Sequence, residues 1–289
     1  MTGTGTQADP YLVTTLGEFI TAIGQSDTYV KLANDIEVSM DPTYKNGINS
    51  LIEVYCTAID GDGHTISGLN VKSTQVFRFA RASLVKNITI KNVMLNCSSS
   101  SSYLITCNAV NSTYATFQNV VISARMNCNN VCYGCFCNNG IWNNCAITFM
   151  VLNTKQCTTN SDNLNIFNFT KATECAIRYD CDRLLFGSYG NVFIVLNAED
   201  SYIFGKINSM QTKYSGTLFR SCVGCASYLD ITGTSSNASL YTLNDRGLNI
   251  IVTDLITGVS FNNMPSTSKC LTSEQAKSEE YLNSIGFLP

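Results

Sequence analysis

The chain has 289 residues, of which 45% are hydrophobic and only 13% are charged. Its net charge of -3, without a run of like charges, excludes an extended phosphate-binding face, so no nucleic-acid partner is expected. No stretch approaches the roughly 18 apolar residues of a membrane-spanning helix, and the first residues lack the basic and apolar runs of a secretory signal. We therefore expect a protein made in the cytoplasm without a signal peptide and without a membrane partner.

The first residues predict a short strand followed by a short helix. Tyr11–Val13 is an apolar run typical of a strand. Thr15 and Glu18 match a capping box, in which each side chain satisfies a backbone N–H group at the start of a helix. Apolar residues at helical spacing then predict the buried face of this helix, formed by Phe19, Ile20 and Ile23.

The middle of the chain alternates short apolar runs with clusters of Asn, Gly and Ser, which is typical of short strands joined by turns. The predicted strands include Val76–Phe79, Leu84–Ile90, Phe117–Ile122, Ala146–Leu152, Leu164–Phe169, Val192–Leu196 and Leu248–Val252. Asn, Ser and Thr are poor in helix interiors and common in turns, so a helical protein is not expected.

Half of the 14 cysteines recur at one period of about 30 residues, which is typical of a solenoid whose coils stack equivalent side chains. The predicted columns are Cys97 with Cys128 and Cys157, Cys107 with Cys137 and Phe167, and Cys145 with Cys175. Stacked inward cysteines behave as small apolar residues, so we expect most of the thiols to be buried and reduced.

Two segments of the first third resemble the pectate-lyase-like β-helix superfamily. Ile59–Leu69, with the sequence IDGDGHTISGL, is similar to a first full coil of that family, and Asn87–Val93, NITIKNV, is similar to the run that follows it. The opening segment, Gly5–Val13 with Phe19–Ile23, resembles the segment before many such solenoids, including phage virion and tail proteins. The resemblance implies an all-β, right-handed parallel β-helix with short N- and C-terminal capping helices.

We expect a single domain over residues 1–289, with an N-terminal cap at 1–35, coils at 36–265 and a C-terminal cap or anchor segment at 266–289. Caps are required because the terminal coils of a solenoid would otherwise expose apolar faces and strand edges. Thr272 and Gln275 suggest a second capping box. The apolar face of that C-terminal segment would be formed by Tyr281, Leu282, Ile285 and Phe287.

The enzyme motifs known in this superfamily are mostly absent. Polygalacturonase-like hydrolases carry a Gly-His-Gly motif and an Arg-x-Lys motif, but here Gly63-His64 is followed by Thr65 and no Arg-x-Lys occurs. His64 is the single histidine, and it is interpreted as a turn residue. Glu199 and Asp200 are adjacent, so on a strand they would point to opposite faces and are interpreted as a loop pair.

The catalytic candidates, if the chain is an enzyme, are Arg178, Asp180 and Asp182. Strand alternation places these three residues on one face, where two carboxylates beside a guanidinium could act as an acid and a base. The favoured interpretation is a solvent-facing turn held by salt bridges. An enzyme is therefore the less favoured class.

Two Cys-x-x-Cys motifs, Cys132 to Cys135 and Cys222 to Cys225, each resemble half of a zinc knuckle. A thiolate zinc site needs two such pairs to meet in space. Because the neighbouring Cys128 and Cys137 already belong to the 30-residue columns, buried thiols are the simpler interpretation. No metal and no cofactor are predicted.

The absence of a catalytic constellation favours a structural function: a phage or other virus virion protein, as a fibre, spike or decoration component, located in the virion. Its predicted partners are other virion proteins or further copies of itself, with a trimer as one candidate, and its candidate ligand is a host-surface glycan used in host attachment. Trp142 is the single tryptophan and the 14 tyrosines could replace it as sugar platforms, so the aromatic content is neutral on this point.

Two alternatives stay open. The first is a tailspike-type polysaccharide lyase or glycoside hydrolase that uses the carboxylates named above. The second is a cell-surface adhesin, which would be glycosylated if it were exported by a eukaryote. The sequons that could then be modified are Asn87, Asn96, Asn111, Asn168 and Asn237.

Overall fold

The computed structural model describes residues 1–44, 46–73, 75–97, 101–108, 113–128, 133–152, 164–181, 184–185, 192–211, 217–241, 250–252, 256–261, 269–272 and 274. Thr272 is exposed within this part of the chain. Gln275 and the apolar residues predicted to form the C-terminal cap lie outside the described residues.

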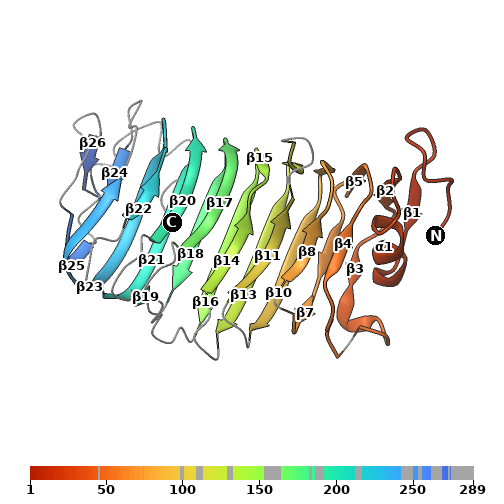
Figure 1. Cartoon of the computed structure of the whole chain (residues 1–289), viewed down its shortest axis with the longest axis horizontal. Coiled ribbons are helices and arrows are strands. Elements are labelled where there is room, and N and C mark those ends of the chain that lie inside the picture. The colour runs from red at the N-terminus through yellow and green to blue at the C-terminus, as the bar shows by residue number, and fades with distance from the viewer. Residues whose placement is uncertain are drawn as a thin grey trace.

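The chain is a parallel β-solenoid with very little helix, as the sequence predicts (Figure 1). Face A contains β1 (Tyr11–Val13), β2 (Tyr29–Leu32), β5 (Ala58–Asp60), β9 (Leu84–Lys86), β12 (Thr116–Gln118), β15 (Ile141–Asn143) and the ends of β17 (Leu164–Thr173) and β20 (Val192–Glu199). Face B contains β3 (Ile36–Glu37), β6 (Thr65–Ser67), β10 (Thr89–Cys97), β13 (Val121–Cys128), β16 (Ala146–Leu152), β18 (Ala176–Cys181), β21 (Tyr202–Gln211), the start of β23 (Ala226–Tyr241), β24 (Ile250–Val252) and β26 (Lys269–Leu271). Face C contains β4 (Ile52–Val54), β8 (Gln75–Phe79), β11 (Ser101–Cys107), β14 (Tyr133–Asn138), the starts of β17 and β20, β22 (Thr217–Arg220) and the end of β23.

Three further short strands extend face B beside the longer ones: β7 (Asn70–Val71), β19 (Leu184–Leu185) and β25 (Ile256–Phe261). A 3-10 turn, Val38–Met40, follows β3.

A column of isoleucines runs inside face B and joins the coils. The register places one residue of each coil directly on its counterpart in the next coil, and the described members from β3 to β23 are buried. We call this the isoleucine column; its members are Ile36, Ile66, Ile90, Ile122, Ile147, Ile177, Ile203 and Ser227. β-Branched side chains stack well at strand spacing, so this column supplies an apolar spine from Ile36 to Ile203.

The predicted cysteine columns are correct in two cases and wrong in one. Cys97 lies in register with Cys128, and Cys145 and Cys175 each precede the paired residues Ala146 and Ala176. Cys157, the third member of the first column, lies outside the described residues.

The predicted pairing of Cys107 with Cys137 is wrong. Cys107 lies on Phe79, whereas Cys137 lies on Ile105 and continues to Phe167. The register along face C advances by 28 residues between β8 and β11 but by 32 between β11 and β14. A constant period of 30 residues therefore misplaces Cys107 by two positions, because the connecting segments differ in length.

The N-terminal helix α1 (Leu16–Ile23) lies at one end of the solenoid, where it covers the first coil (Figure 1). Its buried residues are Leu16, Phe19, Ala22 and Ile23. The predicted Phe19 and Ile23 are confirmed, while Ile20 is half-buried at the margin of the core. The edge of β1 is covered as well, because Thr2 and Leu12 exchange two antiparallel backbone hydrogen bonds of 3.2 and 2.8 Å.

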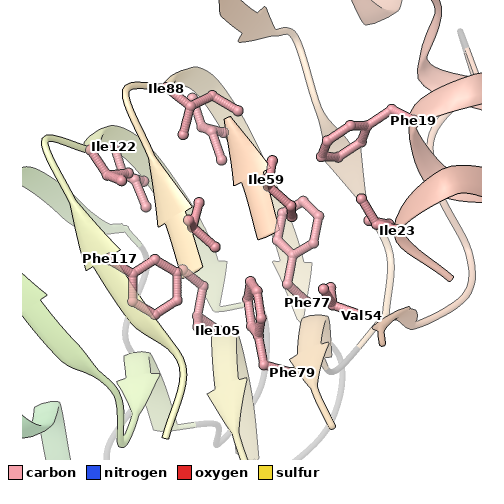
Figure 2. Close-up of a pocket in the computed structure, with 13 residues that line it drawn as sticks. Phe19, Ile23, Val54, Ile59, Phe77, Phe79, Ile88, Ile105, Phe117 and Ile122 are labelled. Carbon is pink, nitrogen blue, oxygen red and sulfur yellow. The ribbon is translucent and has the colours of Figure 1, made fainter. Parts of the chain in front are cut away.

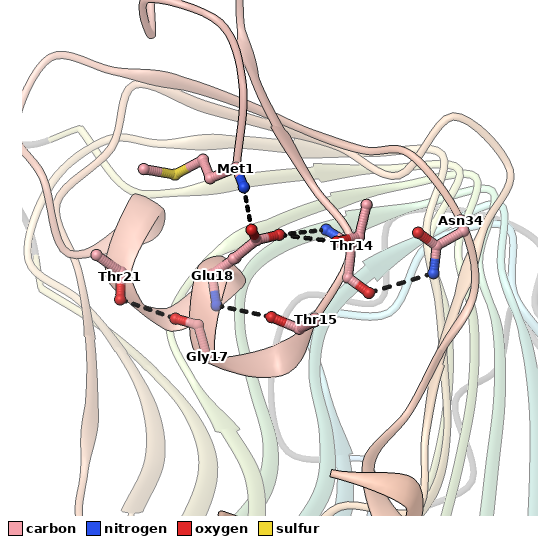
Figure 3. Close-up of polar contacts among 7 residues, drawn as sticks. All are labelled: Met1, Thr14, Thr15, Gly17, Glu18, Thr21 and Asn34. Carbon is pink, nitrogen blue, oxygen red and sulfur yellow. Dashed lines mark hydrogen bonds and ion pairs between the residues drawn. The ribbon is translucent and has the colours of Figure 1, made fainter.

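The predicted capping signal at the start of α1 is confirmed (Figure 3). Thr15 is the N-cap residue, and its hydroxyl accepts a hydrogen bond from the Glu18 N–H at 3.2 Å. The Glu18 carboxylate accepts from the N–H and the hydroxyl of Thr14, at 2.8 and 2.9 Å, and contacts the amino group of Met1. Glu18 therefore reaches one residue further back than in a regular capping box, and ties the start of the helix to the first strand.

Asparagines form a second kind of ladder at the turn between faces A and B. Asn87, Asn119 and Asn144 all have positive φ angles, of 53°, 53° and 50°, which Asn tolerates better than most residues. The Asn119 amide donates to the Asn87 side-chain oxygen at 3.2 Å, and the Asn144 amide donates to Asn119 at 2.8 Å. The Asn87 amide in turn donates to Asp60 at 3.2 Å. Successive turns are thus held in the same conformation by side-chain hydrogen bonds between coils.

The first prediction concerns Ser227, the polar member of the isoleucine column. Its side chain is fully buried, and its hydroxyl has no hydrogen-bond partner among the residues that the structure describes. Since a buried unsatisfied hydroxyl costs about 1–3 kcal/mol, Ser227→Ala should raise the free energy of unfolding by about 1 kcal/mol, measured by urea denaturation. Ser201→Ala is the matched control, because the equally buried Ser201 donates to the Glu199 carbonyl at 2.7 Å and accepts from the Cys175 N–H at 3.1 Å. It should lower stability, and a loss of stability in both variants would contradict the assignment.

The second prediction concerns the pH dependence of the N-terminal cap. Contact with the Met1 amino group and the Thr14 N–H lowers the pKa of Glu18 from 4.5 to about 2. The stabilisation by ionised Glu18 is therefore fully present above pH 4.5 and is lost as the pH falls towards about 2. Glu18→Gln should lower the free energy of unfolding by about 1 kcal/mol at pH 7, with a smaller difference at pH 3.

Denaturant titrations at both pH values test this prediction. Thr15→Ala removes an uncharged cap, so its cost should be the same at pH 7 and pH 3. A Glu18→Gln cost that does not change between these pH values would contradict the assignment.

Candidate functional site

Two of the three catalytic candidates lie together on the outer side of β18. The alternate residues Ile177, Tyr179 and Cys181 are buried, so Arg178 and Asp180 point outward, as strand alternation predicts. The favoured interpretation of this segment as a turn is wrong for these two residues, because both belong to a strand. The Arg178 Nε donates to the Asp180 Oδ2 at 3.1 Å, and the two side chains are 51% and 17% exposed. Asp182 lies outside the described residues, so the predicted pair of carboxylates is not placed by this structure.

The register extends these two positions into a patch on the outside of face B. Arg178 lies beside Phe204, which lies beside Tyr228; Asp180 lies beside Lys206, which lies beside Asp230. We call this patch the outer strip; it consists of Arg178, Asp180, Phe204, Lys206, Tyr228 and Asp230. One row consists of Arg178 and the two aromatic residues, and the other row alternates in charge from Asp180 to Lys206 to Asp230.

The geometry of the outer strip is regular because the backbone register sets it. The rings of Phe204 and Tyr228 have their centroids 6.3 Å apart and are tilted by 43°. Lys206 Nζ lies 3.5 Å from Asp230 Oδ2, and Lys206 is more exposed than the aspartate. The two rings are half-buried, so each keeps part of its surface available to solvent.

The outer strip has the chemistry of a carbohydrate-binding surface. Aromatic rings offer flat apolar faces against which the C–H groups of a sugar ring can pack. Neighbouring charged groups offer strong donors and acceptors to hydroxyl groups, or to acidic groups carried by the sugar. Both carboxylates have a cationic neighbour, Arg178 for Asp180 and Lys206 for Asp230.

Sequence reasoning missed four residues of the outer strip, namely Phe204, Lys206, Tyr228 and Asp230. A signal for them exists, because residues 202–207 and 227–231 both alternate outward polar or aromatic residues with inward small or apolar ones. Aligning these two runs at a spacing of 24 residues pairs Phe204 with Tyr228 and Lys206 with Asp230.

The other acidic pair does not form a site. Glu199 ends β20, and its carboxylate lies 2.8 Å from Lys171 Nζ. Asp200 has a φ of 45° and donates its backbone N–H to the Val223 carbonyl at 2.9 Å, so it is a turn residue. The predicted loop pair is therefore correct for Asp200 and wrong for Glu199, which is the last residue of a strand.

His64 is part of a turn, as predicted. Its backbone N–H donates to the Gly61 carbonyl at 2.8 Å, and its Nδ1 lies 3.2 Å from Asp35 Oδ1. The same Asp35 oxygen accepts from the Thr65 N–H at 2.9 Å. The hydrogen bond from Thr65 and the contact with His64 lower the pKa of the Asp35 carboxyl.

The cysteines whose side chains are described are buried thiols: Cys56, Cys107, Cys137, Cys145, Cys175, Cys181, Cys222 and Cys225. Burial raises the pKa of Cys56 and of Cys107 to about 12, so these two are inert at neutral pH. Within the described ranges, no three His, Cys, Asp or Glu side chains converge on a point that could hold a metal ion. Cys132 lies outside those ranges, so the zinc-knuckle interpretation of its motif is not tested.

Two features of the interior bear on ligand binding. Trp142 is fully buried and stacks on Phe117, with centroids 3.9 Å apart and planes 9° from parallel, so it belongs to the core and is no sugar platform. An apolar cavity of about 20 Å³ lies between α1 and the first coils, and Phe19, Ile59 and Phe77 are among its lining residues (Figure 2). It has room for about one water molecule but no polar partner, so it is a dry packing gap.

The comparisons with known proteins leave the function open. No protein-family model and no curated protein matches this chain. A solved structure from Bacteroides ovatus, described as a "putative immunoglobulin A1 protease", is 13% identical over 94% of this chain and 87% of that chain, with a TM-score of 0.41. No helix in the described part of the chain is long and apolar enough to cross a membrane.

Proposed function

We propose that this protein is a structural component of a virion, as a fibre, spike or decoration protein, and that it binds host-surface glycan through the outer strip. The outer strip is the observation that carries the proposal, because aromatic and charged side chains from three successive coils lie side by side there. The virion assignment is supported by the opening segment Gly5–Val13, which resembles the start of phage solenoids.

Binding without cleavage is favoured by the state of the carboxylates. Asp180 accepts a hydrogen bond from Arg178, and Asp230 lies beside Lys206. Each carboxylate is thus engaged with a cationic side chain, as on a surface held by salt bridges. The same paired groups suit recognition, because they are held in place before the ligand arrives.

The third prediction tests the outer strip with a panel of immobilised neutral and acidic oligosaccharides. The full chain should bind at least one class of saccharide. Phe204→Ala and Tyr228→Ala should each weaken that binding about 2-fold to 10-fold, because the loss of one aromatic contact costs about 0.5–1.5 kcal/mol. Tyr29→Ala is the control, since Tyr29 is a half-buried tyrosine on β2, in face A. Equal losses in all three variants, or no binding by the parent chain, would contradict the role of the strip.

The virion assignment has a separate test. Antibody against this chain should label purified particles in electron micrographs, and the chain should copurify with capsid or tail proteins through a density gradient. If the chain is absent from purified virus particles, the virion assignment is wrong, and the sugar-binding result is unaffected.

A second candidate function is a tailspike-type glycoside hydrolase or lyase. Asp180 and Asp230 occupy the same row on either side of Lys206, so their backbones are two strand spacings, about 10 Å, apart. That is close to the separation of about 6.5–9.5 Å between the carboxylates of an inverting glycosidase.

The fourth prediction separates this candidate from the binding function. If the chain only binds glycan, it should release no reducing ends or unsaturated products from the saccharides that it binds. Activity in the parent chain that falls at least 100-fold in both Asp180→Asn and Asp230→Asn would instead establish the enzyme.

The adhesin alternative predicts modified sequons. The Asn87 amide is engaged with Asp60, and the Asn168 amide donates to Asn138 at 2.8 Å. Attachment of a glycan to either amide nitrogen would disrupt a ladder between coils. These two sequons are therefore poor acceptor sites in the folded chain.

A further inference from the structure

The turn between β22 and β23 contains two buried thiols in one short loop, Cys222-Val223-Gly224-Cys225. Both cysteines are 1% exposed, while Gly224 above them is exposed. Ser221 and Gly224 have positive φ angles of 51° and 64°, so the chain turns sharply on both sides of Val223. The turn brings the two side chains together, and the Cys222 thiol forms a hydrogen bond with Cys225.

The preceding coils do not have two cysteines at these two positions, so the pair of thiols is specific to this turn. Cys225 occupies a position that is filled by Cys145, Cys175 and Ser201 in earlier coils, just before the first paired residue of face B. At this position the side chain donates to the carbonyl two residues before it, with Cys225 to Val223 at 3.5 Å and Ser201 to Glu199 at 2.7 Å. A serine hydroxyl therefore makes the same contact, and the fold does not require a thiol there.

Cys222 occupies the position three residues earlier. The same position holds Trp142, Ala172 and Ala198 in the preceding coils, where it faces the interior from face A. Of these four coils, the coil that contains Cys222 has two thiols in the same turn, and the other three have at most one. The stacked pair Cys145 and Cys175 differs, because its members belong to successive coils and can be linked only across the coil spacing.

We propose that Cys222 and Cys225 form a reversible disulfide within this turn. The oxidant is a small-molecule disulfide such as glutathione disulfide. The Cys225 thiolate attacks one sulfur of the oxidant, forms a mixed disulfide and releases one glutathione thiolate. The Cys222 thiolate then attacks the Cys225 sulfur and releases the second, so that two protein thiols are oxidised, the oxidant is reduced, and the two protons pass to the released thiolates.

The surroundings assign the attacking role to Cys225. The hydrogen bond from Cys222 lowers the pKa of the Cys225 thiol and outweighs the effect of burial. A thiolate is the nucleophile in thiol–disulfide exchange, so the group that ionises more readily attacks first. Cys222 is then the resolving thiol, because it is already in contact with Cys225.

The disulfide would act on β23, one of the three strands that carry the outer strip. β23 begins at Ala226, directly after Cys225, and contributes Tyr228 and Asp230. A covalent link across the turn would fix the start of this strand relative to Cys222 on face A. The proposal does not rest on sugar binding, since the disulfide is detected chemically.

The experiment uses the folded full-length chain and glutathione disulfide as the oxidant. After acid quenching, the remaining thiols are alkylated and the protein is digested with trypsin without reductant. The tryptic peptide Ser221–Arg246 contains Cys222 and Cys225 and no other cysteine, so the internal disulfide appears as the unalkylated peptide lacking two hydrogens. We expect most chains to yield this form, and dithiothreitol to restore two alkylatable thiols.

Two variants test the order of the steps. Cys222→Ser should stop at a mixed disulfide between glutathione and Cys225, whereas Cys145→Ser should form the internal disulfide as the parent chain does. The proposal is overturned if the folded chain leaves this peptide reduced while the guanidinium-unfolded chain is oxidised. Linkage of Cys222 or Cys225 mainly to another cysteine overturns it too.

Discussion

Backbone hydrogen bonding between successive parallel coils is the constraint on which the rest of this structure depends. Each strand donates to and accepts from the neighbouring coils, so the backbone fixes the coil spacing, and the buried side-chain pattern together with the turns selects the register. A residue on one coil must then lie on its counterpart in the next coil. The isoleucine column, the Asn87 to Asn144 ladder and the stacked Cys145 and Cys175 are three results of that single geometric rule.

The same rule explains how a sequence with uneven spacing builds even columns. Residues of the isoleucine column lie at irregular intervals, from Ile66 to Ile90 and then to Ile122, because extra residues enter at the turns. The backbone ladders absorb a smaller part of this variation at register shifts inside strands, such as the shift between Ile90 and Val93 in β10. Between such shifts the pairing is regular, since a one-residue slip would turn every later side chain to the other face. Turns that contain an Asn residue with a positive φ angle return the chain to the same direction in each coil. The next strand therefore pairs in line with the previous one, and the columns continue.

The outer strip is the outward counterpart of these inward columns. Asp180, Lys206 and Asp230 are far apart in sequence, yet the register places them one coil apart in alternating charge. Alternation suits a stack at this spacing, because like charges directly opposite each other would be destabilising. The Cys222–Cys225 turn shows the opposite case, in which a side-chain pair is made within one coil and depends on local backbone angles instead of on stacking.

The sequence by itself determined the solenoid, the helix that begins after Thr15, the outward placement of Arg178 and Asp180, and the register of Cys97 with Cys128. These features depend on alternation, capping and local repeats, which are properties of short segments. The tertiary structure alone decided the true partner of Cys107 and selected the 24-residue alignment that places Phe204 on Tyr228, beside the predicted Arg178. Both pairings depend on the number of residues in the segment that connects one strand to its partner in the next coil. Neither the alternation of a strand nor the composition of the chain predicts that number.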